Sequence, residues 1–172
     1  MAEYSTVFGG LNDFTPGGVD VINDNPKNYV FSNVFDVASQ SAPYERVAVG
    51  KNMEYVIEAV RAEGQSPWYA CSHDEFALCM DGEVEVHMVK LANADAVVDP
   101  DSEGAIALDE APEGQKMGRI VLRRGHQALL PAGAAYRFEA ADPSVLLTQT
   151  IQGPATVERW AEICHAESMS AA

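Results

Sequence analysis

The chain has 172 residues, a length typical of one domain that buries its own hydrophobic core. Acidic residues outnumber basic ones by 26 to 11, and the resulting net charge of −15 disfavours binding to nucleic acid or to an anionic membrane surface. Three cysteines without a C-x-x-C pair, no signal peptide and no apolar run of membrane-spanning length together predict a soluble cytoplasmic protein with reduced thiols.

Residues 1–45 differ from the rest of the chain. Turn-forming clusters at 8–11, 14–18 and 23–26 alternate there with aromatic side chains. This composition predicts an N-terminal arm that packs on the body of the protein or on a partner. Within the arm, residues 29–35 are expected to form a strand or a short extended segment.

From Arg46 onward, apolar residues follow the two-residue period of β-strands. We expect strands at 46–49 and 53–61, with a turn at 50–52 between them. Apolar residues return at 68–71. Strands are also expected at 76–80 and 83–90, joined by Asp81-Gly82, which is a strong hairpin signal.

The remainder of the chain continues this all-β pattern. Residues 92–115 predict a long surface excursion with a short strand at 105–108, and further strands are expected at 118–123 and 145–151. Apolar residues at helical spacing predict one helix at 155–166, with Thr156 as its N-cap. Short strands without alternating helices favour a β-barrel or sandwich, in which residues 46–172 form a single domain.

Two motifs make this prediction more specific. Gly125, five residues, then Pro131-Ala132-Gly133 match the second signature of the cupin family. Glu75, followed by six residues and then Gly82, matches the end of the first signature. The chain therefore resembles a cupin, and this resemblance implies a jelly-roll β-barrel, here with an N-terminal arm and a short C-terminal helix.

The same resemblance implies four metal-ligand positions, where a metal-binding cupin has three histidines and a glutamate. Here they are occupied by Tyr69, Cys71, Glu75 and Tyr136. Phenols with pKa values near 10 are poor ligands at neutral pH, and one carboxylate with one thiol leaves too few donors. We therefore expect no metal or cofactor in this chain, and a polar pocket in its place.

The pocket candidates are His73, Glu75 and Tyr136, and none of them is assigned a catalytic role. His73 precedes Glu75 by two residues, so on a strand both side chains would point to the same side. It is either an acid or base of the pocket or a hydrogen-bonded residue at a strand entrance. Tyr136 either takes part in catalysis or fills the metal's space, with its hydroxyl bonded to Glu75 or to water. His87 and His126 are expected at the surface.

A narrower resemblance covers most of the chain. Residues 8–11, 44–52, 66–70, 73–78 and 124–138 resemble the small subunit of the two-component hydroquinone 1,2-dioxygenases. This family implies a larger cupin-type partner that holds iron(II), in an α2β2 heterotetramer. It also implies that O2 opens the ring of hydroquinone to give 4-hydroxymuconic semialdehyde, with hydroxyquinol as an open alternative substrate.

Two other functions remain open. A metal-independent cupin isomerase or epimerase would use His73 and Tyr136 as acid and base and would act without iron. A non-enzymatic small-molecule-binding cupin would bind its ligand as a stable monomer. In the preferred interpretation, the chain is a metal-free subunit that supports an iron-bearing partner acting on a small phenolic substrate.

Overall fold

The computed structural model describes residues 9–25, 29–164 and 166–167. Strands make up most of the described chain, so the all-β prediction is confirmed. The elements in chain order are β1 (Val19–Asp20), α1 (Val34–Ser39), β2 (Arg46–Asn52), β3 (Tyr55–Gln65), β4 (Trp68–Ala70), β5 (Glu75–Asp81), β6 (Glu83–Leu91), α2 (Ala94–Val97), β7 (Ile106–Leu108), β8 (Gly114–Arg123), β9 (Gln127–Leu130), β10 (Ala134–Ile151), β11 (Thr156–Val157), α3 (Trp160–Ile163) and β12 (Ala166–Glu167).

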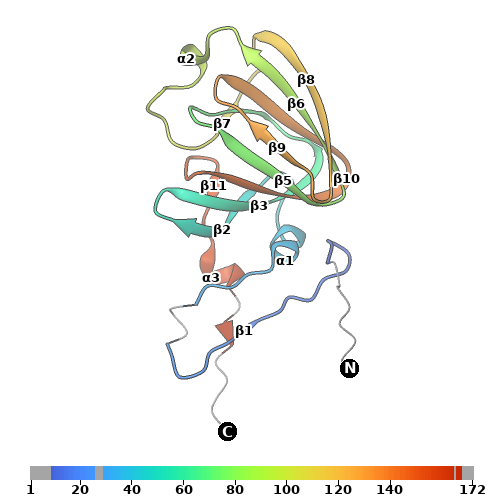
Figure 1. Cartoon of the computed structure of the whole chain (residues 1–172), viewed down its shortest axis with the longest axis vertical. Helices are drawn as coiled ribbons and strands as arrows, with labels where there is room; N and C mark the ends of the chain where they lie inside the picture. Colours follow the sequence, from blue (N-terminus) through green and yellow to red (C-terminus); the bar gives the residue numbers. More distant parts are fainter. Residues whose placement is uncertain (1–8, 26–28, 165, 168–172) are drawn as a thin grey trace.

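The main sheet is organised around β10, a strand of 18 residues. The first part of β10 pairs with β4 and β6, and the second part pairs with β3 and β5, always antiparallel. Beyond these neighbours lie β2, β7, β8 and β9. The register of β10 against β3 shifts between Ala140 and Ser144, and the sheet curls into the half-open barrel of Figure 1.

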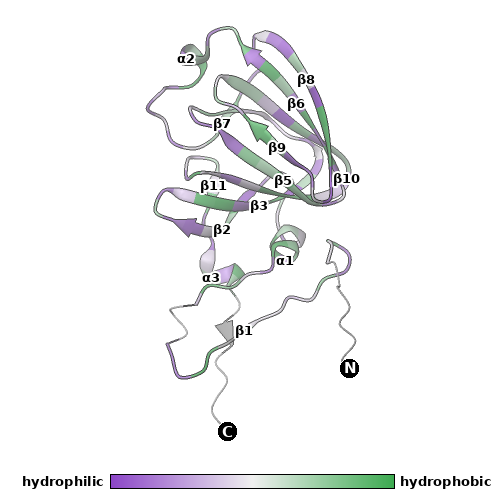
Figure 2. Ribbon diagram, viewed as in Figure 1, coloured by the Kyte–Doolittle hydropathy of each residue, from purple (hydrophilic) through white to green (hydrophobic). Residues whose placement is uncertain are grey.

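The inward faces of these strands form the main hydrophobic core. Five of its aliphatic side chains are no more than 1% exposed: Val84, Val86, Leu122, Leu130 and Leu146. Figure 2 shows hydrophobic and hydrophilic residues interspersed along β6 and β8, as the two-residue period of a half-buried strand requires. The alternation therefore decides which side chains face the interior.

A second, smaller apolar cluster lies where α1 and α3 pack against β2 and β3. Val37 and Ile163 belong to this cluster together with Val47 and Ala59. Before α1, the chain runs beneath the barrel, and its β1 lies beside β12 near the other end of the chain (Figure 1). The backbone N–H of Leu11 donates to the Asp81 carboxylate over 2.7 Å. These contacts tie part of the N-terminal arm to the barrel.

Two predicted boundaries near the N-terminal end of the barrel are wrong. The chain turns after β2 at Met53, whose φ of 57° lies in the left-handed region, and not at residues 50–52. Of the two alternatives for residues 29–35, the strand does not form, and residues 29–33 lie outside any helix or strand. A helix, α1, begins at Val34, because the Asn33 side chain accepts hydrogen bonds from two backbone N–H groups of its first turn.

The predicted C-terminal helix is present but much shorter than residues 155–166. Among the described residues of this range, only α3 is helical, and Thr156 lies in β11, which pairs in parallel with β2. Thr156 does not cap a helix, because its hydroxyl donates to Glu58 over 2.7 Å. The hydrogen bond from Thr156 to Glu58 therefore outweighs the local preference of this segment for a helix.

The other predicted strands are present, but β8 begins at Gly114, before the predicted 118–123, and the predicted strand at 145–151 is only the last part of β10. The hairpin at Asp81-Gly82 joins β5 to β6, and β7 forms at Ile106–Leu108 within the predicted excursion. The excursion also contains the short helix α2. Within the described part of the chain, no helix has the length and hydrophobicity needed to cross a membrane.

Gly82 holds the β5–β6 turn at a φ of +75°, and a Cβ there would lie 2.1 Å from the Ser144 hydroxyl oxygen. We expect Gly82→Ala to lower the free energy of unfolding by about 2–3 kcal/mol, through strain and steric overlap. Urea unfolding measures the change. Gly64→Ala is the matched control, because Gly64 has a φ of +71° but no neighbour within 4 Å. Equal losses in the two variants would contradict the steric part of the prediction.

Candidate functional site

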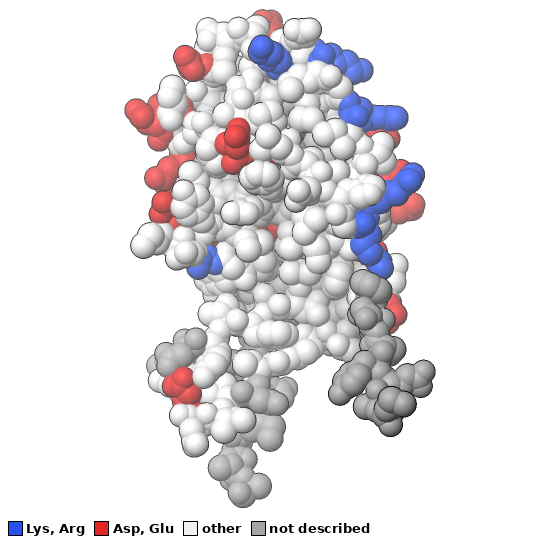
Figure 3. Space-filling view, viewed as in Figure 1, with Lys and Arg blue, Asp and Glu red and all other residues white. Residues whose placement is uncertain are grey.

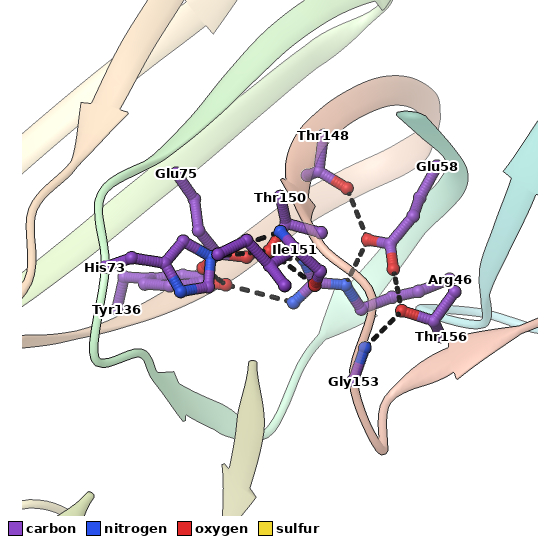
Figure 4. A network of polar contacts seen from close by, with 10 residues as sticks. All are labelled: Arg46, Glu58, His73, Glu75, Tyr136, Thr148, Thr150, Ile151, Gly153 and Thr156. Atoms are coloured by element: carbon purple, nitrogen blue, oxygen red, sulfur yellow. Dashed lines mark hydrogen bonds and ion pairs between the residues drawn. The ribbon is translucent and has the colours of Figure 1, made fainter. Parts of the chain in front are cut away.

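A buried polar cluster centred on Arg46 connects four strands. Arg46 opens β2, and its side chain is only 3% exposed. Its Nε donates to Glu58 over 2.6 Å, and Nη2 donates to Glu75 over 2.9 Å. Its Nη1 donates to the hydroxyl of Tyr136 over 3.0 Å. Figure 4 shows the guanidinium between the two carboxylates, so that one side chain joins β2, β3, β5 and β10.

The carboxylate of Glu58 is fully buried, and both of its oxygens accept hydrogen bonds. Oε2 accepts from Arg46 and, over 2.8 Å, from the hydroxyl of Thr148. Oε1 accepts from Thr156 over 2.7 Å. A buried charge is tolerated when it is paired and hydrogen-bonded, and Glu58 meets both conditions.

The carboxylate of Glu75 is buried to the same degree and also has both oxygens occupied. Oε1 accepts from Arg46, and Oε2 accepts from the hydroxyl of Tyr136 over 2.5 Å. Burial opposes ionisation, but the Arg46 guanidinium and the Tyr136 hydroxyl hold the pKa of Glu75 below its ordinary value. Glu75 is therefore a carboxylate at neutral pH.

The neighbouring acidic groups are held protonated. Burial raises the pKa of Tyr136 far above its usual range, and the Glu75 charge adds to this effect against the opposing pull of Arg46. Burial, followed by the charge of Glu75, also raises the pKa of the Cys71 thiol. Neither a phenolate nor a thiolate is available as a ligand or base at neutral pH.

The structure brings together the four residues at the predicted ligand positions. The Arg46 guanidinium contacts Glu75 and Tyr136 directly and lies 5.4 Å from the centre of the Tyr69 ring. The rings of Tyr69 and Tyr136 are 5.7 Å apart. The donor atoms of Cys71 and Glu75 lie within 4.8 Å of each other. The guanidinium thus lies among the side chains at these positions.

His73 lies in the bend before β5, with a donor atom within 4.8 Å of those of Cys71 and Glu75. Its Nε2 accepts the backbone N–H of Ile151 over 3.2 Å and lies 3.0 Å from the hydroxyl of Thr150. A ring nitrogen that accepts an N–H bond is unprotonated, so the neutral ring carries its proton on Nδ1. Nδ1 is buried and has no hydrogen-bond partner among the described residues.

A metal ion, which the cupin fold implies, does not fit this donor set. Every carboxylate oxygen of Glu58 and Glu75 already accepts a hydrogen bond. A cation also stands between them. Burial opposes the charge of Arg46, but Tyr136 and the two carboxylates hold the pKa of its guanidinium well above the ordinary range. A second cation would have to displace Arg46 before it met an open coordination position.

Comparisons with known proteins identify the family of the chain. No family model matches the sequence, and no curated protein matches it. Among solved structures, hydroquinone 1,2-dioxygenase from Sphingomonas sp. TTNP3 with 4-hydroxybenzoate bound is 63% identical over 96% of this chain and 100% of that chain, with a TM-score of 0.93. The chain belongs to the hydroquinone 1,2-dioxygenase family.

Hydroquinone 1,2-dioxygenase PnpCD matches in two different chains. One chain, in a complex with Cd2+ and 4-hydroxybenzonitrile, is 52% identical over 95% of this chain and 98% of that chain, with a TM-score of 0.88. The other, in a complex with Fe3+, is a longer chain of which only 32% is covered. This second match spans 71% of the present chain at 14% identity and a TM-score of 0.53, which shows a shared fold alone. In this family, the barrel therefore occurs in both a short chain and a longer one.

Arg46 and Glu58 are central to this buried cluster, but the sequence does not predict that they belong to the site. For Glu58, the two-residue period of β3 does contain a signal. Val56, Glu58 and Val60 share one face of β3, and both valines are core residues. A carboxylate on an otherwise apolar inward face needs a buried partner. The sequence alone does not identify that partner as Arg46.

Of the other histidines, His87 and His126 lie in the described part of the chain and make their own contacts. His126 is exposed, as predicted, and its Nδ1 accepts the backbone N–H of Arg123. His87 is only partly exposed and lies 3.1 Å from a carboxylate oxygen of Glu85 on the same strand. His165 lies outside the described residues. These hydrogen bonds of His87 and His126 go to residues outside the Arg46 cluster.

The outer face of the sheet carries a second feature, an exposed apolar row. The strand register places Ile57, Gln149, Phe76 and Leu129 side by side across β3, β10, β5 and β9. The three apolar side chains are 44–47% exposed. In Figure 3, charged side chains lie mostly toward the edges of the view and leave an almost uncharged surface in the middle. We call Ile57, Gln149, Phe76 and Leu129 the outer row.

Proposed function

We propose that this chain is the small, metal-free subunit of a cytoplasmic dioxygenase that opens the ring of hydroquinone. The Arg46 cluster carries the proposal, because a guanidinium stands among the side chains at the predicted ligand positions. The matches at 63% and 52% identity support the reaction class. Free cysteines at positions 71, 79 and 164 fit a reducing compartment.

In this proposal, a larger cupin-type subunit holds iron(II) and forms 4-hydroxymuconic semialdehyde from hydroquinone and O2. The two chains assemble as an α2β2 heterotetramer. The longer PnpCD chain with the same fold supports such a partner. The small subunit stabilises the larger one. Its N-terminal arm, residues 1–45, contacts the larger subunit in addition to the outer row.

We assign the outer row to the contact with the larger subunit. The adjacent apolar residues, Val47 and Ala59, are covered by α1 and α3, whereas Ile57, Phe76 and Leu129 remain exposed. Exposed apolar patches on soluble proteins mark interaction sites. A net charge of −15 on each chain opposes pairing with a second copy, so a different chain is the better occupant.

The two competing functions find less support in the geometry. Acid–base catalysis by Tyr136 and His73 would need a substrate to reach Tyr136, which is 2% exposed and bonded to both Arg46 and Glu75. A small-molecule binding site in the same place would need to displace the guanidinium. Both functions remain outcomes of the following test.

We expect the isolated chain to contain no iron and to open no hydroquinone ring. Co-expression with the larger subunit should yield a complex that contains iron and converts hydroquinone. Iron analysis, oxygen uptake and absorbance of the ring-cleavage product measure these properties. Iron or ring opening in the isolated chain would contradict the proposed division of labour. Isomerisation of a substrate by the isolated chain would favour the metal-independent enzyme.

A further inference from the structure

We infer that Arg46 is a built-in cation that takes the place of the cupin metal and keeps metal ions out of this barrel. The inference rests on the geometry of the cluster. It makes no use of the proposed reaction, and it concerns a residue that the cupin motifs do not include.

The placement of the guanidinium is the first argument. Of the four residues at the predicted ligand positions, Glu75 and Tyr136 bond to Arg46, and the Tyr69 ring lies beneath its charge. Cys71 completes the set next to Glu75. The Arg46 guanidinium thus occupies the position among these side chains that a metal ion would take. Arg46 itself belongs to β2, a strand outside both motifs.

The balance of charge is the second argument. A divalent ion would neutralise both Glu58 and Glu75, whereas one guanidinium neutralises only one of them. Neutral hydroxyl donors stabilise the remaining negative charge: Thr148 and Thr156 donate to Glu58, and Tyr136 donates to Glu75. The hydrogen bonds from these three hydroxyl groups therefore compensate for the negative charge that the single guanidinium does not neutralise.

The state of the remaining donors is the third argument. The Cys71 side chain is buried, and its sulfur lies within 4.8 Å of the donor atoms of His73 and Glu75. His73 accepts the backbone N–H of Ile151 with Nε2, and its Nδ1 then carries the proton. The His73 ring therefore offers no free lone pair to a metal. Removal of the guanidinium leaves the carboxylates of Glu58 and Glu75 around the space that it occupied, with the Cys71 thiol within 4.8 Å of Glu75, which is a donor set for a divalent ion.

Titration with Co2+ tests this inference, because a cobalt–thiolate bond has a charge-transfer absorption of its own. We expect no Co2+ binding by the wild-type chain and one equivalent bound by Arg46→Ala, with a thiolate band and a rise in melting temperature on addition of the metal. Arg46→Ala/Cys71→Ser should lose the thiolate band. If Arg46→Ala fails to fold without metal, Arg46→Ala/Glu58→Gln supplies a variant with fewer buried charges.

Two results would overturn the inference. Stoichiometric Co2+ binding by the wild-type chain, lost in Cys71→Ser, would show that Arg46 does not exclude metal. A folded Arg46→Ala or Arg46→Ala/Glu58→Gln variant that binds no Co2+ would show that the space is not a cation site. Neither result depends on ring cleavage, so the inference can fail while the proposed subunit function stands.

Discussion

Replacement of Arg46 by methionine is expected to lower the free energy of unfolding by about 3–5 kcal/mol. This loss is a large part of the whole free energy of unfolding of a typical domain. Methionine keeps much of the side-chain volume but leaves Glu58 and Glu75 fully buried without a cation. Urea unfolding at neutral pH measures the loss. Arg46→Lys should fall between the wild type and Arg46→Met, since an ammonium keeps the charge but not the planar set of donors.

The pH dependence separates lost charge pairing from lost packing. In the wild type, the pKa of Glu75 is below its ordinary value of 4.5, so this pairing stabilises the fold above the unfolded pKa and is lost as the pH falls through the folded one. Its contribution should thus be constant from pH 7 to pH 6. In Arg46→Met, the pKa of Glu75 should be raised, and the variant should gain stability as the pH falls over this range.

The triple variant Arg46→Met/Glu58→Gln/Glu75→Gln is the matched control. Its buried groups are neutral, and we expect it to recover most of the stability that Arg46→Met loses. A triple variant as unstable as Arg46→Met would assign the loss to packing and would contradict the charge argument.

Charges introduced into the outer row are expected to abolish assembly with the larger subunit. In Phe76→Glu/Leu129→Glu, two carboxylates would enter the proposed contact and lose their hydration there. We expect the affinity for the larger subunit to fall by about 100-fold or more. Co-purification and analytical ultracentrifugation measure the complex, and ring-opening activity should fall with it. The isolated variant should remain folded, because both positions are exposed.

Met117→Glu is the matched control for this experiment. Met117 is 49% exposed, close to the 47% of Phe76, but it lies on β8, which pairs with β6 away from the outer row. We expect it to leave assembly unchanged. If the small chain alone forms a dimer that Phe76→Glu/Leu129→Glu splits, the outer row binds a second copy, and its assignment to the larger subunit is wrong.

The parts of the fold that could be predicted from the sequence depend on local signals. Asp81-Gly82 marked a hairpin, and the alternation from Glu83 onward marked β6 and its buried face. The helix α1 was missed because its decisive signal, the cap at Asn33, is a single side chain in a region rich in turn residues. Thr156 was misplaced because a bond to Glu58, 98 residues earlier in the chain, outweighed its capping preference.

The candidate site was predictable only as far as its motifs extend. The resemblance to metal-binding cupins groups Tyr69, Cys71, Glu75 and Tyr136. Of the two partners expected for the Tyr136 hydroxyl, Glu75 or water, the structure shows Glu75. Arg46 lies on β2, outside both motifs, and reaches Tyr136 across a separation of 90 residues. A long-range contact of this kind depends on how strands pair, which no local pattern encodes.

The position of β10 near the end of the chain has a consequence for synthesis on the ribosome. β3, β4, β5 and β6 all pair with β10, so all four leave the ribosome before their common partner exists. At a translation rate of roughly 5–20 residues per second, the edges of these four strands remain unpaired for seconds. Unpaired edges invite aggregation. The barrel therefore closes only after β10 has been translated, and until then these strands remain open to aggregation.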